Sequence, residues 1–231
     1  MDIDDLRSKS HIKILFRGFS GTGKTLNSCI VALEVAKEGG RVKYIDTEDE
    51  GSETIVDMVD SGWYDSDLEG EIEYTRVTGA KEFFDEFPEE DQCDWDLVVV
   101  DTLDHKHTYA LRVVTDERKK SDVNWNQFPA IYDAEKSFMQ AVGQPDTHIV
   151  ASIDPESGKS DKPKGTQVNV DGYFDIVVRL QRGDNVDWEG VVENFVGDLD
   201  NNYIGKKASG DNLRDFVRQE VAGRVIERSD L

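Results

Sequence analysis

The stretch FRGFSGTGKTLNSCI, residues 16–30, joins a short apolar run to a helical pattern through a glycine-rich turn. The apolar run IKILF at 12–16 predicts a β-strand. Apolar residues then recur every three or four positions from residue 24 to about residue 38, which predicts a helix that Gly39 and Gly40 end. The chain therefore changes from strand to helix across a turn whose glycines allow the backbone to fold tightly.

The turn matches the pattern G-x-x-x-x-G-K-[ST] from Gly18 to Thr25, in the position between strand and helix that this pattern requires. Its backbone N–H groups and the helix N-terminus form a site for phosphate. Lys24 is expected to reach the β- and γ-phosphates of a nucleotide, and the Thr25 hydroxyl to bind Mg²⁺. We therefore predict ATP and Mg²⁺ as ligands. The expected nucleotide-binding residues are Gly18, Phe19, Ser20, Gly21, Thr22, Gly23, Lys24, Thr25 and Leu26.

A second metal-binding residue is expected in the segment WDLVVVDTLD, residues 95–104. Asp101 ends a continuous apolar run that is typical of a strand buried on both faces. Its carboxylate there can hold Mg²⁺ through water. The next residue is Thr102 rather than Glu, so the base that polarises the attacking water is not adjacent to Asp101.

The segment YIDTEDEGS, residues 44–52, supplies a candidate base. Glu48 follows the second expected strand, at the carboxyl edge where open α/β sheets bind their ligands. A carboxylate there can orient water for attack on the γ-phosphate, so Glu48 and Lys24 are the expected catalytic residues. Ser152, which ends the run HIVAS, is a candidate sensor of the γ-phosphate. The neighbouring carboxylates compete with Glu48 for the role of base: Asp46, Asp49 and Glu50.

The rest of the chain alternates apolar β-prone runs with helical patterns. Strands are expected at 42–46, 72–77, 97–101 and 148–153, and helices at 52–61, 79–87, 103–118 and 128–143. After a long polar segment at 154–172, runs at 174–182 and 186–197 predict a β-hairpin, and a helix follows at about 211–222. This order predicts an α/β fold with a mostly parallel central sheet, helices on both faces and a C-terminal β-hairpin, in one domain over residues 1–231.

The composition is strongly acidic. Asp and Glu together number 49 against 27 Lys and Arg, which gives a formal net charge of −22. The acidic residues are spread along the chain, which favours a surface adapted to a salt-rich cytoplasm over a single acidic tail. A generally solvated acidic surface is the alternative. Under the halophilic interpretation the acidity says little about partners, whereas otherwise it argues against nucleic acid.

Targeting signals are not evident in the sequence. No segment approaches eighteen consecutive apolar residues, so no transmembrane helix is expected. The N-terminal sequence MDIDDLRSKS is acidic and polar and lacks the basic and apolar regions of a signal peptide. Cys29 and Cys93 are too few for a disulfide framework or a zinc site of their own. We expect a cytoplasmic protein without membrane contact.

Three motifs together resemble a known superfamily. GFSGTGKT at 18–25, YIDTE at 44–48 and LVVVDTL at 97–103 are similar to RecA/RadA-type recombinases and KaiC-like ATPases, collectively RecA-like P-loop ATPases. The resemblance implies that Glu48 is the catalytic carboxylate. The compact length looks most like the RecA-like nucleotide-binding ATPases of phages and archaeal viruses, some of which act in single-strand annealing or recombination. The likeness covers roughly residues 12–182.

The sequence departs from that superfamily near its C-terminus. There, RecA-like ATPases often carry a strand that offers Lys or Arg to the nucleotide of a neighbouring subunit. The equivalent stretch here reads EGVVENFVGDL and has Glu193 and Asn194 in place of a basic residue. Lys206 and Lys207 follow later and are candidate substitutes. This departure argues against activation between subunits and, with it, against strong hydrolysis.

Local groups of basic residues make single-stranded DNA a candidate partner. In RecA-like proteins, loops in comparable places line a channel that grips single-stranded DNA. A basic strip can bind phosphates even on an acidic protein, because nearby charges dominate when the Debye length is short. Solvated loop lysines are the alternative interpretation. The possible DNA-binding residues are Arg118, Lys119, Lys120, Lys159, Lys162 and Lys164.

Three functions remain open from the sequence. The first is a DNA-dependent RecA-like ATPase of recombination, repair or annealing that assembles as a homo-oligomeric ring or filament. The second is a KaiC-like regulatory or assembly module that is gated by nucleotide and hydrolyses it weakly. The third is a small-molecule phosphotransferase, against which the sequence lacks an Arg-rich lid segment and a second pocket motif.

Overall fold

The computed structural model describes residues 11–86, 93–105, 128–143, 147–155, 170–182, 188–195 and 204–229. Their framework is an eight-stranded sheet with the strand order β3-β2-β4-β5-β1-β6-β7-β8. The strands are β1 (Lys13–Arg17), β2 (Arg41–Asp46), β3 (Glu71–Arg76), β4 (Leu97–Asp101), β5 (His148–Ile153), β6 (Ile176–Arg182), β7 (Trp188–Phe195) and β8 (Lys207–Ser209).

The sheet is mostly parallel, as the sequence predicts. The six strands from β3 to β6 pair in parallel, whereas β7 pairs antiparallel with both β6 and β8. Strand β5 lies between β1 and β4, so the carboxyl ends of these three strands meet at one edge. The two elements that the sequence assigns to phosphate and metal therefore approach each other across β5.

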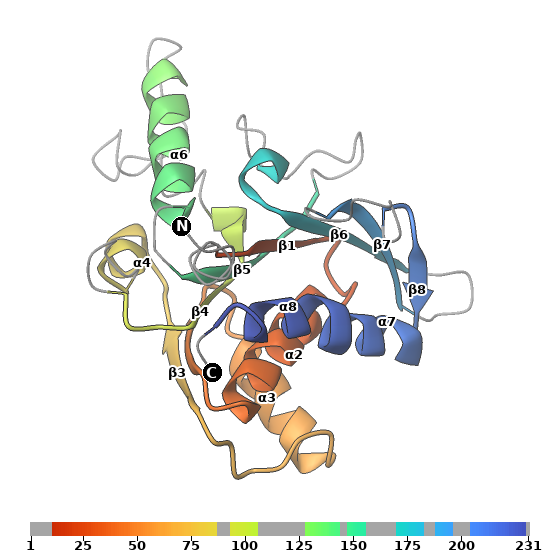
Figure 1. Cartoon of the computed structure of the whole chain (residues 1–231). Helices are drawn as coiled ribbons and strands as arrows, with labels where there is room; N and C mark the ends of the chain where they lie inside the picture. Colours follow the sequence, from red (N-terminus) through yellow and green to blue (C-terminus); the bar gives the residue numbers. More distant parts are fainter. Residues whose placement is uncertain are drawn as a thin grey trace, which may run out of the picture.

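Helices cover both faces of this sheet (Figure 1). On one face lie α2 (Lys24–Lys37) and α3 (Gly51–Asp60), together with the C-terminal α7 (Asp211–Phe216), the π-helical η6 (Val217–Ala222) and α8 (Gly223–Ile226). On the other face lie α4 (Ala80–Glu86), α6 (Phe128–Gly143) and the short 3₁₀ turn η2 (Leu103–His105). A second 3₁₀ turn, η5 (Asp171–Tyr173), precedes β6.

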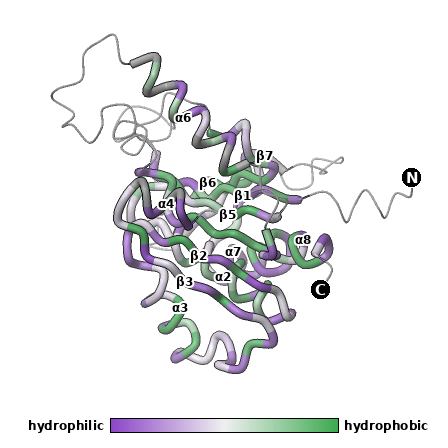
Figure 2. Tube along the Cα trace, turned by 90° about the vertical axis from the view of Figure 1, so that its left-hand side faces the viewer, coloured by the Kyte–Doolittle hydropathy of each residue, from purple (hydrophilic) through white to green (hydrophobic). Residues whose placement is uncertain are grey.

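The sheet separates two apolar layers. Along β4, Val99 packs toward α2, whereas Val98 and Val100 pack toward the layer that contains Phe83 of α4 and Met139 of α6. Every residue of β4 and β5 is buried, which explains why both read as continuous apolar runs rather than alternating ones. Figure 2 shows these hydrophobic stretches along the central strands and α2. The buried centre fixes the strand ends that carry the polar residues.

The expected elements agree closely with the observed ones, with differences toward the C-terminus. The expected hairpin is present as the antiparallel pair β6 and β7, and β8 was not expected because it has only three residues. The expected helix at 211–222 extends to residue 226 and changes to π-helical geometry from residue 217. Of the helix expected at 103–118, the structure describes only η2, and most of the segment 154–172 lies outside the described residues.

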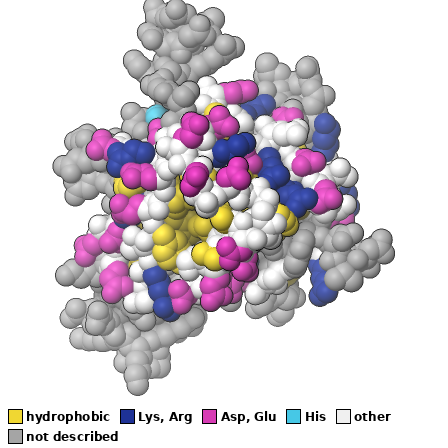
Figure 3. Space-filling view, turned by 90° about the horizontal axis from the view of Figure 1, so that it is seen from below, with side chains coloured by type: hydrophobic (Ala, Val, Ile, Leu, Met, Phe, Trp, Pro, Cys, Tyr) yellow, Lys and Arg dark blue, Asp and Glu magenta, His cyan; other side chains and the backbone are white. Residues whose placement is uncertain are grey.

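The described surface carries the acidic excess of the sequence. Figure 3 shows the molecule from below the view of Figure 1, the side where α3 lies, and there acidic and basic side chains surround a small hydrophobic area. Trp63 and Val56 are among the large apolar side chains exposed on the molecule. Among the described helices, none is both long enough and apolar enough to cross a membrane.

Candidate nucleotide-binding site

The glycine-rich turn forms a compact loop between β1 and α2. Gly21 and Gly23 have positive φ angles of 75° and 85°, a conformation that residues with a Cβ rarely adopt. The amide of Thr22 donates to the carbonyl of Phe19 at 3.1 Å, which closes the loop on itself. At Gly18, a Cβ atom would lie only 2.3 Å from Thr22 Oγ1 and 2.6 Å from the carbonyl oxygen of Leu180. The loop therefore requires its glycines both for conformation and for space.

The loop leads directly into the start of α2. No side chain caps this helix end, where Gly23 occupies the N-cap position in a left-handed conformation. The uncapped N–H groups of the first turn provide hydrogen-bond donors and a partial positive charge, which suit an anion. Phe19, Ser20 and Gly21 are exposed at the rim, whereas Thr22 and Lys24 are buried. The arrangement is that of a phosphate site open to solvent.

The ammonium group of Lys24 lies inside the loop. Its side chain is only 7% exposed and forms an ion pair with the carboxylate of Asp154, directly after β5. It also lies 3.4 Å from the carbonyl oxygen of Phe19. Lys24 is therefore a buried positive charge at the centre of the site, and in this structure Asp154 neutralises it.

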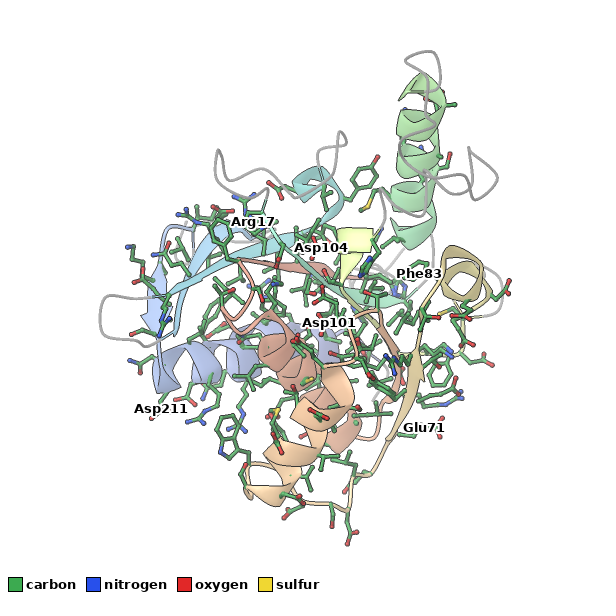
Figure 4. The ribbon with its side chains drawn as sticks, turned by 180° about the vertical axis from the view of Figure 1, so that it is seen from behind. Arg17, Glu71, Phe83, Asp101, Asp104 and Asp211 are labelled. Atoms are coloured by element: carbon green, nitrogen blue, oxygen red, sulfur yellow. The ribbon has the colours of Figure 1, made fainter. Side chains whose placement is uncertain are left out.

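Asp101 lies at the end of β4 beside Thr25. The Thr25 hydroxyl forms a hydrogen bond with the Asp101 carboxylate, which brings together the two residues assigned to metal binding. Two further hydroxyls donate to the same carboxylate: Tyr44 to Oδ2 at 2.9 Å and Ser152 to Oδ1. Burial raises the pKa of Asp101, and these hydrogen bonds oppose that shift. Figure 4 shows Asp101 close to the beginning of α2.

The residues at this point fit a magnesium ion. Mg²⁺ in proteins commonly takes one or two protein oxygens and completes its shell with phosphate oxygens and water. The Thr25 hydroxyl and the Asp101 carboxylate offer two adjacent oxygens next to the phosphate loop. Among the described residues, no group of three or more His, Cys, Asp or Glu side chains is placed to hold a metal ion. Phosphate oxygens and water would therefore have to complete the shell of a Mg²⁺ ion here.

Ser152 has a different contact from the one expected of it. Its side chain is fully buried, and its hydroxyl donates to Asp101 Oδ1 rather than facing the open part of the loop. This geometry favours a role in orienting Asp101 over direct sensing of a γ-phosphate. The sequence places Ser152 at the end of the run HIVAS, but it gives no information on the partner of its hydroxyl.

The carboxylates that compete with Glu48 have other contacts. Asp46 is fully buried, and its two oxygens accept hydrogen bonds from the backbone amides of Glu48, Asp49 and Gly51 and from the Tyr74 hydroxyl. Asp46 thus shapes the turn that carries Glu48. Asp49 forms an ion pair with Arg76 at 2.8 Å. Glu50 is exposed at the N-cap position of α3.

Glu48 has the electrostatic environment of a base. Partial desolvation, together with the negative charges of Asp104, Asp101 and Asp154, raises the pKa of Glu48 to about 7, although the charge of Lys24 opposes the shift. Glu48 is nevertheless exposed to solvent. A carboxyl group that titrates near neutral pH beside a phosphate site suits general base chemistry.

A hydrogen-bonded chain connects the ends of β2, β4 and β5. Thr47 Oγ1 accepts the backbone N–H of Thr102 at 2.9 Å, and the hydroxyl of Thr102 lies 2.9 Å from Asp104 Oδ2. The Asp104 carboxylate in turn accepts the backbone N–H of Asp154 at 3.0 and 3.1 Å. The peptide bond between Asp101 and Thr102 is cis. The loops that bear Glu48, Asp101 and Asp154 are thus held together.

Strand β7 presents an acidic residue beside the loop. Glu193 of β7 forms ion pairs with Arg17, which directly precedes the loop, and with Arg179 of β6 at 3.1 Å. Arg17, which is labelled in Figure 4, also donates a hydrogen bond of 2.9 Å to the Asp171 carboxylate. Lys207, a candidate substitute for a basic residue on this strand, pairs with Glu189 at 2.9 Å.

Several residues of the site were not anticipated from the sequence. Tyr44 and Thr47 contact Asp101, Thr102 contacts Ser152, and Asp154 contacts Lys24. Asp104 acts on Glu48 and Lys24 through its charge. Asp104 and Asp154 follow β4 and β5 at the same carboxyl edge as Glu48. The criterion used for Glu48, a carboxylate just after an expected strand, could therefore have found them as well. Tyr44 has no such signal, because an inward tyrosine on a strand normally fills the core. The expected DNA-binding residues Arg118, Lys119, Lys120, Lys159, Lys162 and Lys164 lie outside the described residues.

Fold and loop together define the class of RecA-like phosphate-loop folds, as the sequence motifs predict. A KaiC-like protein from the hyperthermophilic archaeon Pyrococcus horikoshii OT3 has a similar structure, with a TM-score of 0.52 and 13% identity over 86% of this chain and 84% of its own. The RadB recombinase gives a TM-score of 0.54 and 14% identity over 86% of both chains. No protein-family model and no curated protein sequence matches the chain.

Proposed function

We propose that this protein binds ATP with Mg²⁺ and hydrolyses it at the loop between β1 and α2. The observation that carries the proposal is that four residues come together at one edge of the sheet: Lys24 and Thr25 at the start of α2, Glu48 after β2, and Asp101 at the end of β4. The RecA-like fold supports it at the level of the class. We further propose that residues 1–231 act as one domain.

The residues of the chain have separate tasks in this reaction. The backbone amides from Gly21 to Thr25 surround the phosphates, and Lys24 offsets their charge. Thr25 and Asp101 would hold Mg²⁺, which would supply Lewis-acid polarisation of the terminal phosphate. Glu48 accepts a proton from a water molecule and directs that water toward the γ-phosphate. Ser152 and Tyr44 keep the Asp101 carboxylate in place through their hydroxyls.

A cavity of about 220 Å³ lies next to the phosphate loop and is our candidate site for the nucleoside. The amide of Asn27 lines it and donates to the carbonyl of Gly23 in the loop at 2.7 Å, so the cavity borders the phosphate site. Trp63 provides a flat aromatic surface, and the guanidinium of Arg214 lies 4.4 Å from its ring centroid. Planar aromatic and guanidinium groups suit a nucleobase. We place the base here, among Leu26, Asn27, Ile30, Trp63, Gly210, Asp211, Leu213 and Arg214.

Calorimetric titration with Mg-ATP and a phosphate-release assay test this activity. Replacing Lys24 with Ala should abolish binding or turnover, because the charge that faces the phosphates is lost. Lys37→Ala on the last turn of the same helix is the matched control, since that lysine is 57% exposed and far from the loop along α2. Full ATPase activity in Lys24→Ala would refute the assignment.

For the biological role we propose action on single-stranded DNA in recombination, repair or annealing, as a homo-oligomeric ring or filament. The basic groups at 118–120 and 159–164 support it, as does the fold shared with the RadB recombinase. An ATPase assay in high salt with and without single-stranded DNA tests this role. Stimulation by DNA is expected, and turnover that requires a nucleoside or sugar acceptor would instead indicate a phosphotransferase.

One observation favours the second candidate, a nucleotide-gated module with weak hydrolysis. Strand β7 has no Lys or Arg in its sequence WEGVVENF, and its Glu193 is paired with Arg17 and Arg179 of the same chain. A neighbouring subunit would therefore receive no cation from this strand. Tight Mg-ATP binding with negligible turnover, both with and without DNA, would support this candidate over the first.

A further inference from the structure

The loop lysine is already paired with an anion of its own chain. Lys24 Nζ contacts Asp154 Oδ1, and the two side chains are only 7% and 17% exposed. An ion pair with so little solvent around it is screened less than a surface pair. Asp154 is therefore paired with the positive charge of Lys24, which the phosphates of the proposed nucleotide need for binding.

The backbone fixes Asp154 in this position. It follows Ile153, the last residue of β5, whose carbonyl accepts the amide of Gly18 at 3.1 Å. The amide of Asp154 donates to both oxygens of Asp104, at 3.0 and 3.1 Å. Asp104 is held in turn by Thr102. The backbone of Asp154 is thus held beside the loop by hydrogen bonds that do not depend on Lys24, whereas its carboxylate contacts Lys24.

We propose that Asp154 is the resident counter-ion of Lys24, that nucleotide phosphates must displace it, and that it thereby sets nucleotide affinity. The inference rests on the proposed function, because it concerns how the same site receives its ligand. In this proposal Asp154 acts through its ion pair with Lys24 and does not need to contact the reacting atoms.

Electrostatics gives the direction of the effect. An ammonium group has three N–H donors, so hydrogen-bond geometry alone would allow Lys24 to keep Asp154 and bind phosphate as well. A carboxylate in contact with Nζ, however, lies within a few ångströms of any phosphate oxygen on the same nitrogen, and like charges at that distance repel. Asp104 and Glu48 add negative charge nearby. Removing the charge of Asp154 should therefore strengthen the binding of anions.

The experiment compares wild-type protein with Asp154→Asn, which keeps the size of the side chain and removes its charge. Calorimetric titrations with inorganic tripolyphosphate and with Mg-ATP are run over a series of KCl concentrations. Glu73→Gln is the matched control, because it removes one partner of another lysine that is only 7% exposed, Lys43, on strand β2. Thermal melting and circular dichroism establish folding, and Asp154→Ser replaces the Asn variant if that variant does not fold.

We expect Asp154→Asn to bind both ligands about tenfold more tightly than wild type, with a steeper dependence on KCl because Lys24 is no longer neutralised. Glu73→Gln should match wild type in both respects. Equal or weaker binding by the folded Asp154 variants, or an unchanged dependence on KCl, would overturn the inference while leaving the nucleotide site intact. Failure of the wild-type protein to bind either ligand would overturn the proposed function as well.

Discussion

The hydroxyl of Tyr44, a fully buried residue of β2, donates a hydrogen bond of 2.9 Å to Oδ2 of Asp101 at the end of β4. Register explains the contact, because Tyr44 pairs with Val99, two positions before Asp101 on the neighbouring strand. The same hydroxyl lies 3.5 Å from Cys29 Sγ on α2. A core tyrosine thus reaches from the apolar layer to the carboxylate that we assign to metal binding.

Tyr44→Phe should weaken the response to Mg²⁺. The substitution leaves Asp101 with fewer hydrogen bonds and less fixed, so we expect the Mg²⁺ concentration for half-maximal ATPase activity to rise several-fold. Loss of a hydrogen bond to a buried carboxylate should also lower the free energy of unfolding by about 1–2 kcal/mol. Tyr74→Phe is the control, since its hydroxyl donates to Asp46 at 2.6 Å instead. Equal Mg²⁺ requirements in both variants and wild type would contradict the role of Tyr44.

The pH profile of hydrolysis should reflect Glu48. A general base acts in its deprotonated form, and the pKa of Glu48 is raised to about 7, so kcat/KM should increase as the pH rises from 6 to 8. Glu48→Gln should retain Mg-ATP binding but lose about 100-fold or more of the hydrolysis rate. Initial-rate measurements across this range test both statements.

The control for Glu48 lies one residue away. Asp49→Asn removes a neighbouring carboxylate that is paired with Arg76 at the surface, and it should preserve both the rate and the profile. If Glu48→Gln kept the wild-type rate, the base would have to be another carboxylate at this edge, with Asp104 as the first candidate.

The sequence predicted the fold well because its signals are local. Buried strands such as β4 read as continuous apolar runs, and the glycine pattern from Gly18 to Gly23 defines both the loop and the start of α2. Strand β8 escaped prediction since three residues at the sheet edge carry no apolar periodicity. The π-helical segment from Val217 packs against α2, and its residue types do not distinguish it from an α-helix.

The site was predicted less completely, because partners distant in sequence decide it. We chose Glu48 and Asp101 because each lies at or just after the end of an expected strand. That criterion did not reveal that the Asp46 carboxylate accepts the backbone amides of the turn around Glu48. The pairing of Lys24 with Asp154 joins residues 130 positions apart and depends on β5 lying beside β1. Such contacts follow from the strand order, which a single sequence does not specify.

His148 should make the protein less stable in mild acid. Its Nδ1 accepts the backbone N–H of Ile12 at 2.9 Å, and burial, followed by the nearby His11, lowers its pKa to about 4. The unfolded chain takes up this proton near pH 6.5, whereas the folded protein resists it until about pH 4. Stability should therefore fall as the pH drops through this interval, by on the order of 3 kcal/mol from His148 alone.

Urea unfolding at several pH values between 7 and 4 measures this loss. Carboxylates also titrate in the range, so His148→Gln provides the reference: it can still accept the Ile12 amide but has no ionisable group. The variant should show a smaller decrease in the free energy of unfolding than wild type. Parallel curves for the two proteins would exclude His148 as a source of the pH dependence.

Salt should stabilise the protein if its acidic surface is an adaptation to a salt-rich cytoplasm. With a formal net charge of −22, repulsion between carboxylates opposes the compact state, and raising the KCl concentration shortens the distance over which it acts. We expect the melting temperature to rise steadily from 0.1 to about 2 M KCl. A smaller effect is expected at pH 5, where the carboxylates carry less charge. A melting temperature independent of KCl would contradict the halophilic interpretation.

Trp63→Ala separates recognition of the base from recognition of the phosphates. Trp63 is 40% exposed at the cavity beside Asn27 and stacks with Arg214, so its removal should weaken Mg-ATP binding about tenfold. Inorganic tripolyphosphate lacks a base and should bind the variant as well as wild type. Val56→Ala is the control, because Val56 is an exposed apolar residue of α3 that does not line the cavity. Calorimetry with both ligands decides the matter: equal losses for ATP and tripolyphosphate would mean that Trp63 supports the loop as a whole, and unchanged ATP binding would place the nucleoside elsewhere.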